Sequence, residues 1–232
     1  MLTPTSQWFK TREVIIRCAQ RRMLATLSIP SGAQAVVAFA HGSGSGRFSA
    51  RNQFVASILQ KAGLATLLLD LLEDEEAEVQ QNVFDIELLA SRLNDAANWL
   101  RDDVDTRGMT LGFFGASTGG AAALLAESQN PKRVGAIVSR GGRPDLAGNA
   151  LEQVSAPTLL IVGGNDGVVV ELNERAFQRL RCPKEIVVVP GATHLFPEPS
   201  ALEEVARLAR NWFVRWLRHE TLGDTQATDA SR

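Results

Sequence analysis

The segment Gly115-Ala-Ser-Thr-Gly119 places one serine between two glycines, directly after an apolar run and before a stretch of small residues. A G-x-S-x-G pattern between a strand and a helix is typical of a nucleophile elbow, a tight turn that lifts a serine hydroxyl clear of a sheet. Glycines are needed on both sides because strand and helix approach too closely there for side chains. Ser117 is therefore the candidate nucleophile of an acyl-transfer reaction.

A serine hydroxyl becomes a good nucleophile only when a base takes its proton, and the chain has three histidines. His41 directly follows a predicted buried strand, where a structural role is expected. His219 lies at the end of the last predicted helix. His194 stands in a loop that follows the last predicted strand, which is where an exposed base should lie. We therefore predict that His194 is the base.

A third residue should orient the imidazole and stabilise its charged form. Asp166 lies in Gly163-Gly-Asn-Asp-Gly167, just past a predicted strand, and gives the chain order Ser117, Asp166, His194. Asn-Asp-Gly is also an ordinary turn sequence. Asp145, which follows the preceding strand, therefore stays open as the alternative acid.

Catalysis at a carbonyl also needs donors for the developing oxyanion. We expect one from the backbone amide of Thr118, the residue after the nucleophile. The other is expected from the amide of Ser43 in the loop His41-Gly-Ser-Gly-Ser-Gly46, where glycines let the backbone approach a substrate oxygen. A donor of this kind increases kcat by a factor of about 10²–10³.

The same glycine-rich loop suggests an alternative, a dinucleotide-binding turn with Asp70 as the ribose ligand. A G-x-G-x-x-G pattern that starts at Gly42 needs a glycine at position 47, where the chain has Arg47. A phosphate-binding P-loop is not supported either, because no Gly-Lys-Ser/Thr follows. The signal for a nucleotide is therefore weak.

The chain alternates short apolar runs with helical patterns. Two β-rich runs separated by a polar turn predict an N-terminal hairpin. The later runs are apolar without alternation, which suits parallel strands covered on both faces. Strands alternating with helices predict a doubly wound α/β fold, whose ligands lie beyond the carboxyl ends of the strands. The predicted strands are 14–17, 24–29, 35–40, 65–69, 110–114, 134–138, 158–162 and 185–189, and the predicted helices cover 54–59 behind a Ser49 cap, 86–100 and 202–217.

Composition limits the function classes. The chain has 232 residues, with 24 basic and 26 acidic side chains, so no broad basic field is available for nucleic acid. Two cysteines far apart argue against a disulfide scaffold. No apolar run approaches the length of a membrane span, and no secretory signal is recognised at the start. We expect a cytoplasmic monomer or homodimer that does not bind membranes, with an N-terminal extension (1–12), one domain (13–218) and a flexible tail (219–232).

Charged loop residues complete the set of candidates. Glu73-Asp-Glu-Glu76 is predicted to be a solvated loop, and no Cys/His cluster suggests a metal. Besides the loop residues His41 and Gly42, arginines near the predicted site are candidates for substrate binding, because a guanidinium can clamp a carboxylate. For any single arginine, exposure to solvent or pairing with the nearby Asp145 is the favoured alternative. These arginines are Arg47, Arg140 and Arg143.

Over residues 13–218 the chain resembles α/β-hydrolases of the dienelactone-hydrolase-like group. The segments that carry the resemblance are Ala38-Phe-Ala-His-Gly-Ser-Gly-Ser45, Gly115-Ala-Ser-Thr-Gly119, Ser139-Arg-Gly-Gly-Arg-Pro-Asp145, Ile161-Val-Gly-Gly-Asn-Asp166 and Pro190-Gly-Ala-Thr-His-Leu-Phe196. The resemblance implies an eight-stranded sheet, a Ser/Asp/His triad and no cofactor. One departure is that dienelactone hydrolases proper use a cysteine nucleophile, whereas this chain has Ser117.

The expected function is therefore hydrolysis of a carboxylic ester or lactone through an acyl-enzyme. The short connection between the strands on either side of residues 139–157 leaves no room for a large lid, which favours small or medium substrates. A thioesterase or acyltransferase would use the same machinery. A non-catalytic binding module with this fold is the alternative from a different class.

Overall fold

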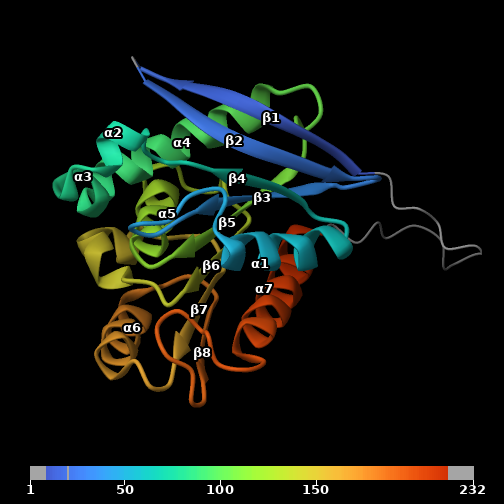
Figure 1. Cartoon of the computed structure of the whole chain (residues 1–232). Coiled ribbons are helices and arrows are strands. Elements are labelled where there is room, and N and C mark those ends of the chain that lie inside the picture. Colours follow the sequence, from blue (N-terminus) through green and yellow to red (C-terminus); the bar gives the residue numbers. More distant parts are fainter. Residues whose placement is uncertain (1–8, 20, 219–232) are drawn as a thin grey trace, which may run out of the picture.

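An eight-stranded sheet in the order β1-β2-β4-β3-β5-β6-β7-β8 runs through the middle of the molecule (Figure 1). The computed structural model describes residues 9–19 and 21–218, so His219 and the predicted tail lie outside the described residues. The strands are β1 (Phe9–Cys18), β2 (Arg21–Pro30), β3 (Ala35–Ala40), β4 (Ala65–Leu69), β5 (Thr110–Ala116), β6 (Ala136–Arg140), β7 (Thr158–Gly163) and β8 (Lys184–Val189).

The hairpin β1–β2 is antiparallel and pairs with β4 through β2, while β3 to β8 pair in parallel. This confirms the predicted α/β architecture. Strand β1 begins at Phe9, earlier than the predicted 14–17, because its polar first half still pairs with β2. Lys10 and Arg12 also form ion pairs with Asp105 and Asp103, which fix that half against the segment before β5.

Helices cover both faces of the sheet (Figure 1). Helices α1 (Ala50–Lys61) and α7 (Ala201–Leu217) pack on one face around Phe39, Phe114 and Phe213. The other face carries α4 (Ile86–Asp102), α5 (Thr118–Gln129), α6 (Gly167–Arg179) and the 3₁₀ segment η1 (Pro144–Gln153). Because both faces are covered, β3 to β7 are almost wholly buried, which explains their unbroken apolar sequences.

The predicted helices are present with capping that matches the sequence. The hydroxyl of Ser49 accepts a hydrogen bond from the amide of Asn52 at 3.5 Å, at the start of α1. The carboxylate of Asp85 accepts one from the amide of Leu88 at 2.9 Å, at the start of α4. These side chains satisfy amides that the first turn of a helix leaves free.

The segment Glu73–Glu76 is exposed or half-buried, as its charge predicted, but it is not a loop. It leads into the short helices α2 (Asp74–Ala77) and α3 (Gln80–Phe84). The carboxylate of Glu73 accepts a hydrogen bond from Arg21 at 2.9 Å, and that of Glu76 accepts one from the buried Arg92 at 2.9 Å. The prediction of a loop was wrong because the partners, on β2 and α4, are far away in the sequence.

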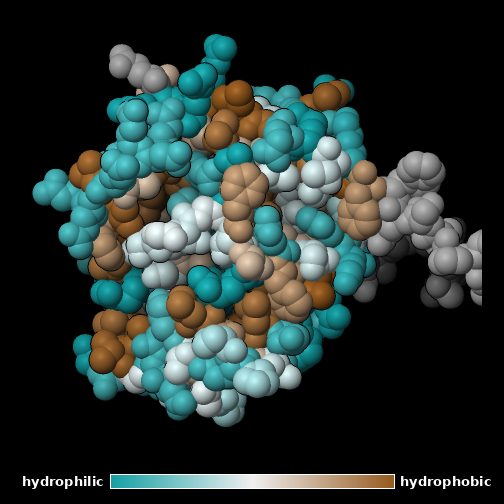
Figure 2. Space-filling model, in the orientation of Figure 1, coloured by the Kyte–Doolittle hydropathy of each residue, from teal (hydrophilic) through white to brown (hydrophobic). Residues whose placement is uncertain are grey.

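Within residues 9–19 and 21–218, no helix has the length and apolar character needed to cross a membrane. Hydrophobic side chains on the face shown in Figure 2 gather in several separate patches among hydrophilic ones.

Candidate active site

Ser117 occupies a strained turn between β5 and α5, with φ 52° and ψ −122°. The two neighbouring glycines make this turn possible. A Cβ atom on Gly115 would lie 2.4 Å from the carbonyl oxygen of Gly119, and a Cβ atom on Gly119 would lie 2.1 Å from that of Ala40. A left-handed φ is costly for a serine and is found where the surrounding structure imposes it, often at functional sites. The geometry is that of a nucleophile elbow.

His194 and Asp166 face each other from two loops at the same edge of the sheet. Nδ1 of His194 donates a hydrogen bond to Oδ2 of Asp166 at 2.7 Å. Asp166 directly precedes α6, and His194 follows β8. The two loops are joined tightly because the amide of Asn165 donates to the carbonyl of Ala192 at 2.9 Å. The histidine side chain is 38% exposed, so it is not sealed inside the protein.

Asp145, the alternative acid, has a different partner. Its carboxylate accepts two parallel hydrogen bonds from Arg143, from Nε at 2.9 Å and from Nη2 at 2.8 Å. This pairing holds the pKa of the Arg143 guanidinium above its usual range. The structure therefore brings Asp166, and not Asp145, to His194.

The segment after β6 connects the serine to the histidine. The amide of Ser117 donates to the carbonyl of Arg140 at 3.3 Å. The next residue, Gly141, has φ 51°, and a Cβ atom on it would lie 2.9 Å from the carbonyl oxygen of His194 and 3.7 Å from its Cε1 atom. Ser117 and His194 thus both lie against the segment Arg140–Gly141 at the end of β6.

The loop after β3 lies directly against the elbow. A Cβ atom on Gly42 would lie 2.8 Å from the Cβ atom of Ser117, so only a glycine allows this approach. Ser43 follows Gly42 and lines the cavity described below, and Thr118 is the first residue of α5. Both predicted oxyanion donors therefore stand beside the nucleophile in the chain or in space. Their role in binding an oxyanion stays a prediction.

His41 uses both of its ring nitrogens within the protein. Nε2 accepts a hydrogen bond from the amide of Leu71 at 2.9 Å, and Nδ1 donates to the carbonyl of Gly42 at 2.9 Å. Burial lowers the pKa of this imidazole, which favours the neutral form that this bonding requires. These contacts give His41 a structural role, because they connect the loop after β3 to the end of β4.

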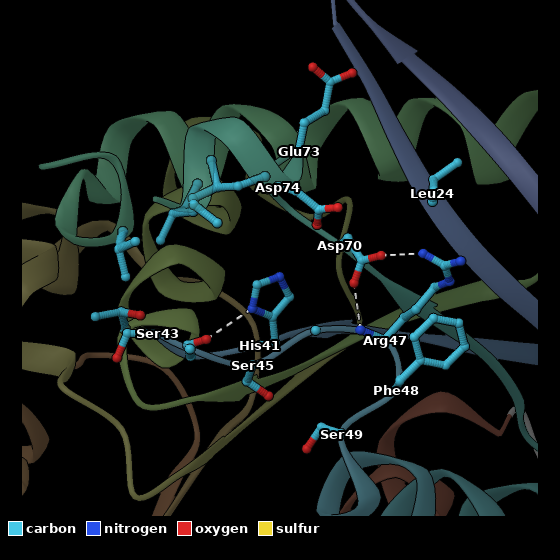
Figure 3. A pocket seen from close by; sticks show the side chains of 18 of the residues that line it. Leu24, His41, Ser43, Ser45, Arg47, Phe48, Ser49, Asp70, Glu73 and Asp74 are labelled. Carbon is cyan, nitrogen blue, oxygen red and sulfur yellow. Dashed lines mark hydrogen bonds and ion pairs between the residues drawn. The ribbon is translucent and has the colours of Figure 1, made fainter. Parts of the chain in front are cut away.

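Arg47 is paired within the protein. Its amide donates to Asp70 at 2.6 Å, and its guanidinium forms an ion pair with the same carboxylate and lies 4.2 Å from the ring centre of Phe48 (Figure 3). Asp70, the ribose ligand of the dinucleotide alternative, is thus already paired with Arg47. Substrate clamping by Arg47 or Arg143 stays a prediction, and it would require a substrate to compete with Asp70 or Asp145.

A cavity of about 960 Å³ opens beside the elbow. One wall comes from the hairpin and the α2–α4 region and is mixed. The exposed apolar side chains of Ile15 and Leu24 line it beside the charged Arg22, Glu73 and Asp74. The glycine-rich loop and the start of α1 form the opposite side (Figure 3). Its lining includes Ile15, Leu24, Ser43, Arg47, Phe48, Arg51, Leu72, Val83, Leu89 and Thr118. In the described part of the chain, no group of three or more His, Cys, Asp or Glu side chains could hold a metal ion.

Sequence reasoning missed several residues that shape this site. Glu198 accepts hydrogen bonds from the amide of Thr193 at 3.0 Å and from its hydroxyl at 2.5 Å, which fixes the loop next to His194. Arg51 lines the cavity from α1. A glutamate in a loop and an arginine in a helix carry no local signal, because their roles come from contacts that the fold creates.

Comparisons with known proteins agree with this geometry. The sequence profile of the dienelactone hydrolase family matches residues 26–221. The crystal structure of a dienelactone hydrolase from Anabaena variabilis is similar, with 52% identity and a TM-score of 0.87, over 90% of this chain and 99% of that one. Est1E from Butyrivibrio proteoclasticus shares the fold, with 15% identity and a TM-score of 0.75, over 88% of this chain and 98% of that one.

A protein of Mycobacterium tuberculosis, named as a candidate phosphoribosyl transferase, is 57% identical over 188 residues. The match covers 81% of this chain and 42% of that protein, so the chain spans less than half the length of this relative. The name describes the longer protein. From the profile match and the Anabaena structure, we conclude that the chain has the α/β-hydrolase fold and belongs to the dienelactone hydrolase family of hydrolases.

Proposed function

We propose that the protein is a serine hydrolase that cleaves a small or medium carboxylic ester or lactone through an acyl-enzyme. The observation that carries this proposal is the hydrogen-bonded pair His194–Asp166 at the same sheet edge as a serine in a strained elbow. Family membership supports ester hydrolysis in general. The serine nucleophile and the acyl-enzyme are our inference.

In the proposed mechanism, Nε2 of His194 takes the proton from the Ser117 hydroxyl while Oγ forms a bond to the ester carbonyl carbon. Asp166 keeps the imidazole in the required tautomer and stabilises its charged form. The tetrahedral oxyanion accepts hydrogen bonds from the amides of Thr118 and Ser43. The imidazolium then protonates the leaving alkoxide as the carbon–oxygen bond breaks. Water, deprotonated by the same imidazole, then attacks the acyl carbon. The bond from this carbon to Oγ breaks, the carboxylic acid leaves, and the imidazolium returns its proton to the Ser117 oxygen.

The cysteines of the chain argue for serine as the nucleophile. Cys18 lies on β1 and Cys182 just before β8, and both are buried. Burial raises the pKa of both thiols, which lowers the fraction of reactive thiolate. Neither thiol has the elbow geometry of Ser117. In this chain, the serine therefore takes the place that a cysteine holds in dienelactone hydrolases proper.

The cavity supports a substrate of small or medium size. A volume of about 960 Å³ lies at the upper end of the range for small-molecule sites. The apolar side chains of Ile15 and Leu24 in its lining suit an acyl or alkyl group, while the polar glycine-rich loop lies on the nucleophile side.

Hydrolysis of p-nitrophenyl acetate and butyrate by the wild type and by Ser117→Ala tests the proposal. We expect turnover by the wild type and a loss of about 10⁴-fold or more in kcat for the variant. Equal turnover by both proteins would overturn the assignment of the nucleophile. Circular dichroism of the variant provides the control for folding.

A further inference from the structure

We propose that Arg51 and Arg140 form a binding subsite for a phosphoryl group at the N-terminus of α1, next to the nucleophile. Where the phosphoryl group is part of the ester, this inference rests on the proposed function and narrows its substrate class. Where it is free phosphate, the subsite stands independently of ester hydrolysis.

Arg140 is a buried cation without an anionic partner. It is 6% exposed, and no carboxylate of the described residues lies within ion-pair distance. Its Nη2 atom makes a long contact of 3.5 Å to Oδ1 of Asn52, and the guanidinium lies 5.9 Å from the ring centre of Phe196. Its Nε atom is buried and has no acceptor in the described structure. Burial and the nearby charge of Arg51 lower its pKa to about 10.

Arg51 is the second cation of the subsite. It lies in the first turn of α1 and lines the large cavity. Like Arg140, it has a buried Nε atom without an acceptor and no ion pair to any described residue. Three other arginines around the site are neutralised, since Arg47 is paired with Asp70, Arg92 with Glu76 and Arg143 with Asp145. Arg22 also lines the cavity without an ion pair to a described residue, but its side chain is exposed to water. Arg51 and Arg140 thus differ from these three arginines in having no ion pair, and from Arg22 in being partly or wholly buried.

The start of α1 adds to the positive potential. The first turn of this 12-residue helix holds no acidic residue. The Ser49 hydroxyl accepts from the amide of Asn52, while the described residues provide no acceptor for the amides of Ala50 and Arg51. Free amides and the helix dipole favour an anion at this position. Arg140 reaches the same turn through its contact with Asn52.

The charges indicate which anion fits. Arg140 is costly to bury without a counter-charge, and Arg51, which is partly exposed, adds a second unpaired positive charge beside it. Together they favour a ligand with a matching negative charge. A phosphoryl group carries about −1.5 to −2 at pH 7 and has three acceptor oxygens, and it binds well to the planar donor fork of arginine. A carboxylate supplies one charge and two oxygens, which would leave one of the cations uncompensated.

The subsite adjoins the proposed reaction centre. The carbonyl of Arg140 accepts the hydrogen bond from the amide of Ser117 at 3.3 Å, so the two residues are fixed to each other. Arg51 and Ser43 line the same cavity. A phosphorylated ester anchored at Arg51 would therefore extend along this cavity, whose lining includes Thr118, the residue after Ser117.

Binding is tested with inorganic phosphate by titration calorimetry on Ser117→Ala, which removes any turnover. We expect one saturable site per chain, with affinity weakened at least tenfold in Arg51→Gln and in Arg140→Met. The matched control is Arg22→Gln, which removes an exposed positive charge from the same cavity and should change the affinity less than twofold. An absent site, or equal weakening by all three substitutions, would overturn the proposal.

Thermal unfolding shows whether the variants in this test are folded. Because methionine replaces an unpaired buried charge, Arg140→Met should unfold at or above the wild-type temperature without phosphate. Phosphate should raise the unfolding temperature of the wild type but not that of this variant. If Arg140→Met does not fold, Arg51→Gln, which changes a partly exposed side chain, decides the question alone.

Kinetics distinguish a phosphoryl group on the substrate from free phosphate. We compare 1-butyrylglycerol 3-phosphate with 1-butyrylglycerol. If the substrate carries the group, kcat/KM favours the phosphorylated ester, and Arg51→Gln lowers the ratio of the two kcat/KM values at least tenfold. Equal values together with calorimetric binding assign the subsite to free phosphate. If neither ester is hydrolysed, the proposed function fails, while the calorimetric result still decides the subsite.

Discussion

Nδ1 of His194 and Oδ2 of Asp166 lie 2.7 Å apart, although the two residues come from loops after different strands. The distance is that of a charge-assisted hydrogen bond. Asp145, which also follows a strand at this edge, is held by two hydrogen bonds from Arg143. Asp166 is thus hydrogen-bonded to the imidazole, whereas the carboxylate of Asp145 is bonded to Arg143.

This relationship predicts that two similar substitutions have different effects. Asp166→Asn should lower kcat for p-nitrophenyl butyrate by about 10⁴-fold, because an amide favours the wrong imidazole tautomer. Asp145→Asn, the matched control, should stay within about tenfold of the wild type, since it loses only a partly exposed ion pair. A larger loss in Asp145→Asn than in Asp166→Asn would contradict this assignment.

From the geometry of the elbow, we predict that both stability and activity depend strongly on Gly119. In Gly119→Ala, the new methyl group would lie 2.1 Å from the carbonyl oxygen of Ala40 and 2.7 Å from that of His41, both of them backbone atoms. We expect the free energy of unfolding to fall by about 3 kcal/mol and activity to be lost. Gly167→Ala is the control, because no atom lies within 4 Å of its new methyl group. Its stability, measured by urea unfolding, should change by less than about 0.5 kcal/mol.

We predict that His41 contributes to the pH dependence of the free energy of unfolding. Its pKa is lowered in the folded state, so the unfolded state binds the proton more readily. The stability that neutral His41 provides is present above its unfolded pKa of about 6.5 and is lost as the pH falls below that value. The free energy of unfolding should therefore depend less on pH between about 7.5 and 5.5 in His41→Gln than in the wild type. Parallel curves would show that His41 makes no such contribution.

The buried cysteines predict a characteristic inhibition pattern. Iodoacetamide should leave esterase activity unchanged at neutral pH, because burial raises the pKa of Cys18 and Cys182 and shields both thiols. Phenylmethylsulfonyl fluoride, which modifies activated serines, should abolish the activity. Inhibition by iodoacetamide that the double variant Cys18→Ser/Cys182→Ser removes would contradict this expectation.

Much of the fold could be predicted because its signals are local. The predicted bounds of strands β3 and β4 agree with the structure, since buried parallel strands have unbroken apolar sequences. The capping roles of Ser49 and the helical period of α4 were visible for the same reason. The first part of β1 and the short helices near Glu73 were not predicted, because partners distant in the sequence stabilise them.

For the site, the residues were easier to predict than their pairing. Ser117, Asp166 and His194 follow three strands whose carboxyl ends must meet in a doubly wound sheet. Pairing of Asp145 with a nearby arginine was expected from the sequence, but the choice between Asp166 and Asp145 needed the contact of Asp166 with His194, which sequence spacing does not encode. The sequence also did not predict that Arg51 and Arg140 have no anionic partner. The absence of a partner can be recognised only when the positions of all neighbouring side chains are known.

The most direct test of the central claim is to trap the acyl-enzyme. The protein is mixed with p-nitrophenyl butyrate, quenched in acid within the first turnovers and analysed by intact and peptide mass spectrometry. We predict an added mass of one butyryl group on the peptide that contains Ser117, and no such adduct in Ser117→Ala. Turnover without this adduct, or an adduct on Cys18, Cys182 or another residue, would contradict the account.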